Sequence, residues 1–265
     1  MSTLQPKTVA ELRQEIKQAT KQEFDLLKRA LAADERKGVR DAIATAQRKW
    51  DAVASENARV DAMYDFQATL AHNGVLMGLD EVGRGPVAGP LTVAAVVLPD
   101  NPHIAGLNDS KQITPAHRQE IAQEIKSCAR AYDIEHISPQ EIDALGMSAC
   151  LRLAFSRAIQ AIDAQGIACD VVLLDGNPLH IDDREVNVIK GDAQCASIAA
   201  ASIIAKVERD ALMVKLAETY PEYGFDKSKG YASAEHINAI KKYGLTPVHR
   251  ATFCTSFLEQ QQTLF

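Results

Sequence analysis

Residues 75–98 read VLMGLDEVGRGPVAGPLTVAAVVL, two short apolar runs on either side of a segment rich in glycine and proline. Runs of this length are typical of buried β-strands, and Gly and Pro mark the turn between them. Similar runs recur at 132–137, 171–175 and 186–190. Helical patterns occur at 115–128, 139–145, 148–165, 193–218 and 233–243. Two strands followed by alternating helices and strands predict an α/β domain with a mixed sheet.

The first 70 residues follow a different pattern. Apolar residues recur every three or four positions from Val9 to Leu31 and again from Val39 to Val53, which predicts helices. Thr8 and Glu11 have the spacing of a capping box, and Gly38 is expected to end the first helical stretch. We therefore expect a helical N-terminal extension, residues 1–70, followed by an α/β domain, residues 71–265, which ends in helices.

Composition limits the classes of protein. Of 265 residues, 46% are hydrophobic and 24% charged, as in ordinary globular proteins. The net charge of −6 excludes a protein that coats nucleic acid through bulk positive charge. It leaves room for a nucleic-acid enzyme whose acidic residues hold metal ions. Five scattered cysteines without a CxxC pair disfavour a disulfide framework or a zinc site. With no signal segment and no apolar run of 18 residues, a cytoplasmic protein without membrane contact is expected.

Four acidic residues occur where predicted strands meet loops. Asp80 and Glu81 end the first strand, Asp175 ends a later one, and Asp192 follows the last. Such carboxylates converge at one edge of an open sheet. Divalent cations such as Mg²⁺ or Mn²⁺ would relieve their repulsion, and two ions can activate a water and stabilise the leaving oxygen of a phosphodiester. Each residue alone also fits a turn or a helix cap, so only the set of four indicates a metal site.

The glycine loop, residues 78–90, is more specific than a generic glycine motif. Its small residues let backbone amides approach a phosphate or a ribose, and Arg84 could neutralise a phosphate. The lysine and hydroxyl of a P-loop are absent, and no GxGxxG opens a helix here. Taken alone, the loop fits equally well a tight hairpin with an exposed arginine.

Six ordered blocks resemble bacterial ribonuclease HII, a type 2 ribonuclease H. They are GLDEVGRGPVAGP (78–90), LNDSK (107–111), LLDGN (173–177), KGD (190–192), AAASIIAK (199–206) and KGY (229–231). The resemblance spans roughly residues 74–256. It implies a ribonuclease H-like α/β fold for residues 71–265, a mixed five-stranded sheet flanked by helices with a C-terminal helical part. The all-helical N-terminal extension precedes this domain.

The resemblance also implies an activity, that of a metal-dependent endonuclease of the hydrolase class. Such an enzyme cleaves the RNA strand of RNA–DNA hybrids and cuts 5′ of single ribonucleotides embedded in duplex DNA, leaving 5′-phosphate and 3′-hydroxyl ends, a step in the DNA repair that removes ribonucleotides. The implied catalytic residues and ligands of two Mg²⁺ or Mn²⁺ ions are Asp80, Glu81, Asp175 and Asp192. The alternatives are a nuclease for long hybrid tracts and a non-catalytic hybrid-binding protein with the same fold.

Contacts to the ribose come from the same resemblance. The backbone of Gly83, Arg84 and Gly85 would bind the 2′-hydroxyl, the group by which a protein distinguishes RNA from DNA. Tyr231 would bond the same hydroxyl and pack on the next sugar, which favours an RNA–DNA junction. Without the resemblance, Tyr231 would be a half-buried aromatic residue with its hydroxyl in water.

Several polar residues near these blocks have weaker assignments. Lys111 is expected to meet a phosphate near the scissile bond, and its alternative is a solvated lysine on a turn. Lys227 and Lys229 are expected to contact more distant phosphates. His249 is interpreted as a structural histidine, and Asp210 as a structural acid paired with a neighbouring base.

The resemblance does not explain residues 1–70. They lack strand alternation, which argues against the sheet-built N-terminal domain of the ribonuclease HIII class. Three roles stay open: a supporting helical hairpin, a contact with a partner protein, or a grip on the duplex through Lys17, Lys21, Lys28 and Arg29. The C-terminal residues 260–265, QQQTLF, fit either a frayed end or a weak docking tail for a sliding clamp. The protein is expected to be a monomer.

Overall fold

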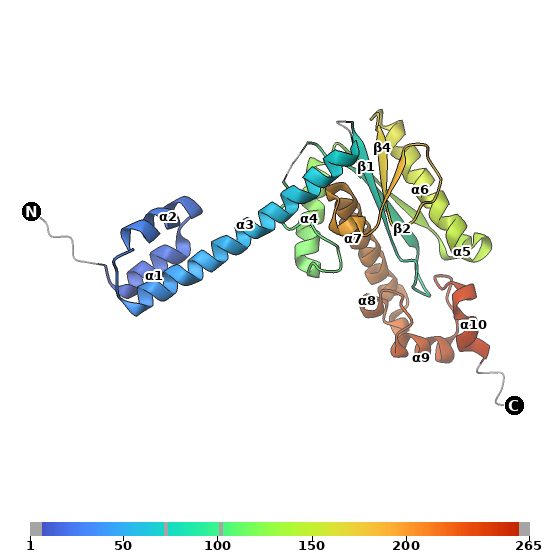
Figure 1. The fold of residues 1–265 in the computed structure, drawn as a ribbon. Coiled ribbons are helices and arrows are strands. Elements are labelled where there is room, and N and C mark those ends of the chain that lie inside the picture. The colour runs from blue at the N-terminus through green and yellow to red at the C-terminus, as the bar shows by residue number, and fades with distance from the viewer. Residues whose placement is uncertain (1–6, 72–73, 101–102, 260–265) are drawn as a thin grey trace, which may run out of the picture. The chain divides into compact units, whose positions relative to one another are not determined.

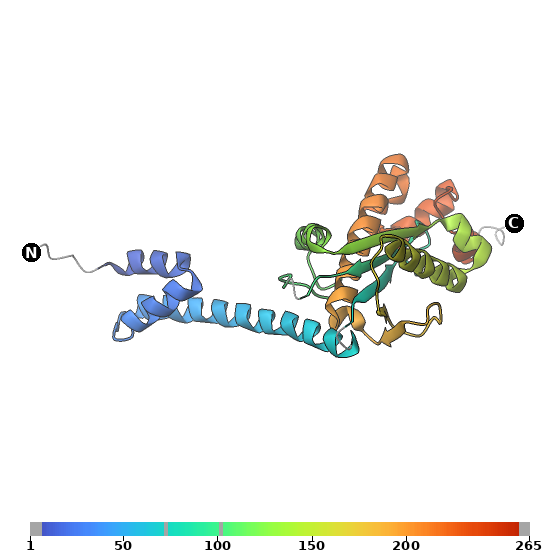
Figure 2. The ribbon, with the colours of Figure 1, turned by 90° about the horizontal axis from the view of Figure 1, so that it is seen from above.

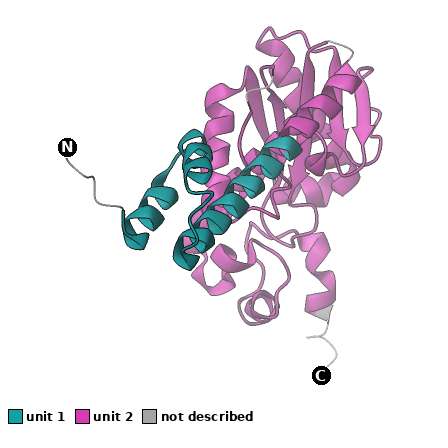
Figure 3. Ribbon diagram, turned by 60° about the vertical axis from the view of Figure 1, so that its left-hand side comes forward, with its two compact units in different colours: residues 1–59 teal, residues 60–265 magenta. Residues whose placement is uncertain are grey.

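The fold comes from a computed structural model, which describes residues 7–71, 74–100 and 103–259 (Figure 1). Its helices and strands are, in chain order, α1 (Val9–Gln18), α2 (Lys21–Ala30), α3 (Lys37–Ala71), β1 (Leu76–Val82), β2 (Leu91–Val97), α4 (Pro115–Cys128), β3 (Ala131–Ile137), α5 (Pro139–Leu145), α6 (Met147–Ala164), β4 (Val171–Asp175), β5 (Glu185–Val188), the 3₁₀-helix η1 (Gly191–Ala193), α7 (Ala196–Thr219), the 3₁₀-helix η2 (Pro221–Tyr223), α8 (Phe225–Ser228), α9 (Ala234–Tyr243) and α10 (Ala251–Glu259). The chain forms two compact units, Met1–Arg59 and Val60–Phe265 (Figure 3). The predicted domain boundary at residue 70 stays a prediction.

The N-terminal unit is helical, as its apolar spacing predicts. The capping box of Thr8 and Glu11 opens α1, and a second box, made by Thr20 and Glu23, opens α2. The second box was not anticipated, although its T-x-x-E spacing is the same. It explains why the apolar stretch from Val9 to Leu31 forms two helices and not one. The helices bury a small core around Phe24.

Gly38 corrects one sequence prediction. It lies in the first turn of α3 and ends no helix. A β-carbon at this position would lie 2.6 Å from Cγ1 of Val9, so the glycine lets the start of α3 approach α1 closely. The break comes earlier, where the Arg36 guanidinium bonds the Asp34 carboxylate and the carbonyl oxygen of Lys7.

The second unit contains the predicted mixed sheet of five strands, in the order β3-β2-β1-β4-β5. β1 pairs antiparallel with β2 and parallel with β4; β2–β3 is antiparallel and β4–β5 parallel. One face carries α6 over an apolar core, and the other carries α7 and α4 (Figures 1 and 2). The sheet therefore brings the carboxyl ends of β1 and β4 side by side.

Strand alternation decides which residues of β1 face α7. Met77 and Leu79 point into the core on the α6 side. Gly78 faces α7, where a β-carbon would lie 2.3 Å from the backbone of Ser197. This close approach requires a residue without a side chain, and the small residues at the start of α7 complete it. Asp80, two positions further on, shares the α7 face.

Boundaries near the end of the sheet differ from the prediction. β5 ends at Val188, before the predicted end at residue 190, because Lys190 adopts a left-handed conformation with φ +57°. The predicted start of the long helix forms η1 instead, and α7 begins at Ala196. The short helices α8 and α10 had no clear pattern in the sequence. With α9 they surround a core that contains Tyr223 and Phe225.

Two predictions about chemistry and membranes can be compared with the fold. All five cysteines are free thiols, which agrees with the expected absence of a disulfide framework. Within the described ranges, no helix combines the length and the apolar character needed to cross a bilayer.

Candidate active site

The four predicted carboxylates lie together at one edge of the sheet. Asp80 and Glu81 belong to the end of β1, Asp175 is the last residue of the neighbouring β4, and Asp192 lies in η1. The backbone N–H of Gly191 donates to Oδ1 of Asp175 at 2.6 Å, which joins η1 to the end of β4. The negative charge of Asp175 contributes to raising the pKa of each of the other three carboxyl groups.

Asp80 is the most deeply placed of the four, with 7% of its surface exposed. Burial, followed by the charge of Glu81 and then that of Asp175, raises the pKa of Asp80 well above its usual value. A hydrogen bond with the Ser202 side chain and one from the N–H of Glu81, at 2.7 Å, only partly offset this rise. A nearby cation would lower this pKa again, because it favours the charged form of the carboxyl.

Glu81 has a cationic neighbour within the loop. Nη1 of Arg84 lies 3.1 Å from its carboxylate oxygen. Burial still raises the pKa of Glu81, and the Arg84 charge opposes that rise. The Arg84 side chain is largely exposed. The Glu81 side chain is only 14% exposed, so an Arg84 that turned toward a phosphate would leave a largely buried carboxylate in need of another cation.

Asp192 links the carboxylates to Lys111. Burial raises the pKa of Asp192, as do the charges of Asp175 and Asp109, whereas the charge of Lys111 lowers it. Lys111 is exposed on the turn that follows Asp109, and its N–H donates to Oδ1 of Asp109 at 2.9 Å. The charge of the lysine predicted to meet phosphate thus acts on one carboxyl group of the set.

The donor atoms fit a hard divalent cation. Across the described residues, no three His, Cys, Asp or Glu side chains are arranged to hold a metal ion. Successive strand residues point to opposite faces, so Asp80 and Glu81 leave β1 in different directions. The site nevertheless offers oxygen ligands alone, on buried carboxylates that repel one another. A charged carboxylate in such surroundings is costly unless a cation accompanies it, and oxygen ligands are those that Mg²⁺ and Mn²⁺ prefer.

Ser202 is a site residue that sequence reasoning missed. It lies on α7, where its side chain lowers the pKa of Asp80 and its hydroxyl shares a hydrogen bond of 3.1 Å with the hydroxyl of Ser110. Ser110 directly precedes Lys111, so one serine connects the carboxylates with the lysine turn. The available signal was a hydroxyl group inside the apolar run AAASIIAK, which lies in the half of α7 whose residues 196–205 are all buried.

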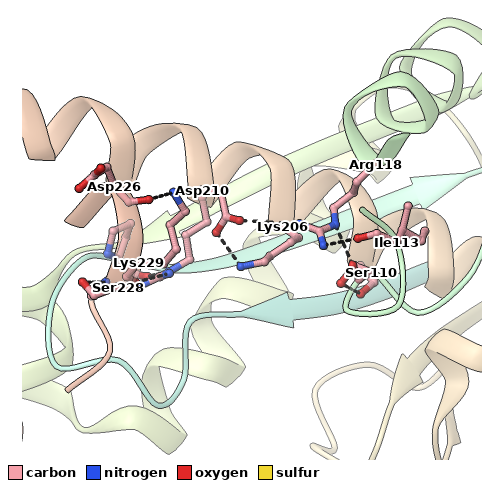
Figure 4. Close-up of polar contacts among 12 residues, drawn as sticks. Ser110, Ile113, Arg118, Lys206, Asp210, Asp226, Ser228 and Lys229 are labelled. Carbon is pink, nitrogen blue, oxygen red and sulfur yellow. Dashed lines mark hydrogen bonds and ion pairs between the residues drawn. The ribbon is translucent and has the colours of Figure 1, made fainter. Parts of the chain in front are cut away.

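A second missed residue, Arg118, stabilises the turn that carries Lys111 (Figure 4). Its guanidinium donates to the carbonyl oxygens of Ser110 and Ile113, both at 2.7 Å. Asp210 accepts a hydrogen bond from Lys206 at 2.6 Å and lies 3.8 Å from Arg118. The predicted pairing of Asp210 with a neighbouring base is confirmed, and its structural role stays a prediction.

The glycine loop lies beside Tyr231. A β-carbon on Gly85 would stand 3.7 Å from Cε1 of the Tyr231 ring, and half of the Tyr231 surface is exposed. The N–H groups of Val87 and Ala88 both donate to the carbonyl oxygen of Gly230, at 2.9 and 3.2 Å. The structure thus brings the predicted ribose contacts, the loop backbone and the tyrosine, next to each other.

Comparison with known proteins gives the family. The family model described as Ribonuclease HII matches residues 77–256. The chain belongs to the ribonuclease HII family. A second model, described as Ribonuclease HII N-terminal domain, matches residues 8–71, so the helical extension that the six sequence blocks left unexplained is itself a recognised ribonuclease HII part.

Individual relatives agree with this membership. The chain is 40% identical over 227 residues to a ribonuclease HII of Desulfitobacterium hafniense, which covers 85% of this chain and 86% of that protein. The crystal structure of the ribonuclease H2 from Pyrococcus horikoshii matches with a TM-score of 0.61 at 28% identity, covering 71% of this chain and 99% of that one. The ribonuclease HII in complex with PCNA from Archaeoglobus fulgidus matches with a TM-score of 0.58 at 27% identity, covering 66% and 93%.

Family membership establishes the class of activity. A ribonuclease HII is a ribonuclease H-type endonuclease, a hydrolase that acts on RNA in RNA–DNA hybrids, and this chain is an enzyme of that class. The predicted ribonuclease H-like fold is likewise confirmed by the structural relatives. The alternative of a non-catalytic binding protein is therefore set aside.

Two further sequence interpretations concern residues near the C-terminal end of the catalytic domain. Nζ of Lys229 donates to the carbonyl oxygen of Asp226 at 2.5 Å, so this side chain folds back on its own turn (Figure 4). Its phosphate contact stays a prediction, as does that of the exposed Lys227. His249 is buried and bonded to His236 and Thr246, as expected of a structural histidine.

Proposed function

We propose that this chain cuts the phosphodiester on the 5′ side of a single ribonucleotide in duplex DNA, in addition to cleaving the RNA strand of hybrids, and leaves 5′-phosphate and 3′-hydroxyl ends. One observation carries the proposal. The glycine loop continues directly from Asp80 and Glu81, and its Gly85 lies against the ring of Tyr231. A ribose held between loop and ring would therefore lie beside the segment that carries two of the carboxylates.

In this proposal Asp80, Glu81, Asp175 and Asp192 would hold two Mg²⁺ or Mn²⁺ ions. Bound cations would supply a water of lowered pKa and stabilise charge on the departing 3′-oxygen. The contribution of the chain is to keep its oxygen ligands in place. The Gly191 N–H fixes one Asp175 oxygen, which leaves the other oxygen of that carboxylate for a cation.

The positive side chains have a separate task. Lys111 lies close to Asp192 and would neutralise the phosphate that enters beside the carboxylates. Arg84 would exchange its pairing with Glu81 for a second phosphate oxygen, since arginine binds phosphate well through its planar fork. Charge builds on oxygen atoms during the reaction, so this positioning is the main catalytic contribution of the protein.

Selectivity for the ribonucleotide follows from hydrogen bonding. A site built to bond a 2′-hydroxyl leaves polar groups unpaired when deoxyribose occupies it, and such loss discriminates strongly. Tyr231 offers both a hydroxyl for that bond and a ring for the adjoining sugar. A deoxyribose at the adjoining position lets the ring pack closely, which favours the junction from RNA to DNA.

We also propose that the C-terminal tail contacts a sliding clamp. An Archaeoglobus fulgidus ribonuclease HII forms a complex with PCNA, a structure that this chain resembles at 27% identity. The tail itself, residues 260–265, lies outside the described residues. The monomeric state and the role of the N-terminal helices stay predictions.

The decisive experiment uses a DNA duplex that contains one ribonucleotide, with an all-DNA duplex of the same sequence as control. Purified protein is assayed with Mg²⁺, with Mn²⁺ and with EDTA, beside an Asp80→Asn variant. We expect cleavage only at the 5′ side of the ribonucleotide and only with a metal. The Asp80→Asn variant should lose at least about 100-fold in rate while it still binds the duplex. Cleavage restricted to long hybrid tracts, or cleavage in EDTA, contradicts the proposal.

A further inference from the structure

Arg250 is a buried arginine whose hydrogen bonds all go to the glycine loop. It precedes α10, and its side chain is fully buried. Nη2 donates to the carbonyl oxygen of Gly83 at 2.7 Å, and Nη1 donates to that of Arg84 at 3.1 Å. The remaining bonds reach the carbonyl oxygens of Pro86, at 2.8 Å, and Gly89, at 2.9 and 3.0 Å. One guanidinium thus holds four peptide groups of a single loop.

Carbonyl dipoles compensate the charge of Arg250. It forms no ion pair with any described residue. Burial and the neighbouring Arg209 lower the pKa of Arg250 to about 10, so the guanidinium stays protonated at neutral pH. Burying a cation costs several kcal/mol unless its donors are satisfied. Here every satisfied donor fixes the backbone of the glycine loop.

Two of these bonds determine where the following amides point. In a trans peptide unit the C=O and N–H bonds point in opposite directions, and the described peptide bonds are all trans. Because the carbonyl oxygens of Gly83 and Arg84 point inward to the guanidinium, the N–H groups of Arg84 and Gly85 point outward. Both residues are exposed. Neither N–H has a hydrogen-bond acceptor in the part of the chain that the structure describes.

The outward amides emerge beside Tyr231. Its ring is within ordinary contact distance of Gly85. The N–H groups of Arg84 and Gly85 and the tyrosine hydroxyl can therefore all bond one small polar group. A hydroxyl oxygen has two lone pairs and can accept from both amides, while its own proton is free to be donated. A ribose 2′-hydroxyl has these properties, and deoxyribose lacks the group.

We propose that Arg250 is a positioning residue for ribose recognition, which it achieves by turning two carbonyl groups inward so that the Arg84 and Gly85 amides meet the 2′-hydroxyl. The inference rests on the proposed cleavage at single ribonucleotides and extends it to a residue remote in sequence. Arg250 touches no substrate. Its effect appears only as a difference in affinity between a duplex with a ribonucleotide and one with a deoxyribonucleotide at the same position.

The test measures that difference as binding, without turnover. In an Asp80→Asn background, dissociation constants are measured for a duplex with one ribonucleotide and for the matching all-DNA duplex, and their ratio gives the preference. An added Arg250→Lys substitution keeps the charge, but a compact ammonium cannot span four carbonyl groups. We expect the preference to fall by about three- to tenfold, with the affinity for all-DNA duplex changed less than about twofold.

Arg118→Lys, in the same background, is the matched control. Arg118 is also a buried arginine that donates to backbone carbonyl groups, but in the turn that carries Lys111. Its substitution should weaken binding of both duplexes equally and leave their ratio unchanged. Unchanged preference in Arg250→Lys, or an equal loss on both duplexes, overturns the role of Arg250. Absence of any preference in Asp80→Asn itself would instead overturn the proposed function.

A second measurement needs no substitution at Arg250. Hydrogen exchange of the Arg84 and Gly85 amides is followed in the Asp80→Asn protein by NMR, with each duplex bound. The ribonucleotide duplex should slow exchange of both amides relative to the all-DNA duplex. Equal exchange with the two duplexes overturns the inference even if Arg250→Lys does not fold.

Discussion

The hydroxyl groups of Ser202 and Ser110 share a hydrogen bond of 3.1 Å. The Ser202 side chain also lowers the pKa of the buried Asp80 carboxyl, and Ser110 directly precedes Lys111. One serine of α7 therefore connects a carboxylate of the sheet edge with the turn that offers a lysine to the phosphate. A change at this serine should affect both halves of the site.

Ser202→Ala should raise the Mg²⁺ concentration needed for half-maximal cleavage by about tenfold. A hydrogen bond to a charged group is worth about 1.5–3 kcal/mol, and its loss would leave Asp80 less well oriented and harder to ionise. The Mg²⁺ dependence of the initial rate measures this. Ser197→Ala is the control on the same helix, because the Ser197 hydroxyl is buried without a hydrogen-bond partner among the described residues. Equal Mg²⁺ requirements in both variants would contradict the role of Ser202.

Substitutions of Tyr231 separate its ring from its hydroxyl. Tyr231→Ala should slow cleavage at a single ribonucleotide by at least about tenfold and weaken duplex binding less, because the ring aligns the sugar more than it anchors the duplex. Tyr231→Phe should cost about three- to tenfold in rate, the usual effect of one neutral hydrogen bond. Single-turnover rates and dissociation constants of both variants check this. Equal losses in rate and binding would argue against positioning by the ring.

Two glycines of the same loop should respond differently to alanine. Gly83 has φ +94°, and a β-carbon there would lie 2.3 Å from Nε of Arg209. Gly83→Ala should lower the free energy of unfolding by about 2 kcal/mol or more, through left-handed strain and overpacking. Gly85 meets only ordinary contact with Tyr231, so Gly85→Ala should unfold near the wild-type temperature. Thermal unfolding of the two variants tests this contrast, which similar melting temperatures would refute.

The buried histidine pair should make stability depend on pH. The N–H of Thr246 donates to Nδ1 of His249, and the two Nε2 atoms of His249 and His236 lie 3.0 Å apart. Nδ1 of His236 bonds the carbonyl oxygen of Tyr231. For neutral rings this order is satisfied when His249 donates to His236 and His236 donates to Tyr231. A further proton on either ring would remove an acceptor from the series.

The sign of the effect follows from the shifts. Burial, and then the charge of His236, lowers the pKa of His249 to about 4, and burial lowers the pKa of His236, against about 6.5 in the unfolded chain. Between pH 6.5 and 4 the unfolded chain binds more protons at His249, so stability falls as pH falls, by up to about 1.4 kcal/mol per unit for this ring. The lowered pKa of His236 acts in the same direction. Urea unfolding across this range measures it. Carboxyl groups with raised pKa values act in the opposite direction, so the comparison is with His249→Asn, whose profile should be flatter.

Local patterns were sufficient for most of the fold. The five strands and most helices follow from apolar periodicity and turn residues, because these elements form where neighbouring residues agree on one conformation. The four carboxylates could be grouped since each follows a strand, and the ends of neighbouring parallel strands meet. The β1–β4 pairing brings Asp80 near Asp175 in this way.

The rest depends on contacts between distant segments. Gly38 reads as a helix end, and only the approach of Val9 shows that it serves close packing. No residue next to Arg209 or Arg250 in the sequence indicates that their N–H groups bond carbonyl oxygens of the glycine loop. Ser202 is similar, because its partners Asp80 and Ser110 come from two other segments. Such roles appear only when the chain is folded.

The bond from Arg250 to the carbonyl oxygen of Gly83 spans 167 positions of the chain. A polypeptide emerging from the ribosome therefore carries every carboxylate of the site long before it can shape the loop beside them. A product truncated after α9 would retain Asp80, Glu81, Asp175 and Asp192 yet lack the side chain that turns the loop carbonyls inward. Loop and carboxylates mature at different times, because Arg250 is synthesised after all four carboxylates and completes a structure that β1 began.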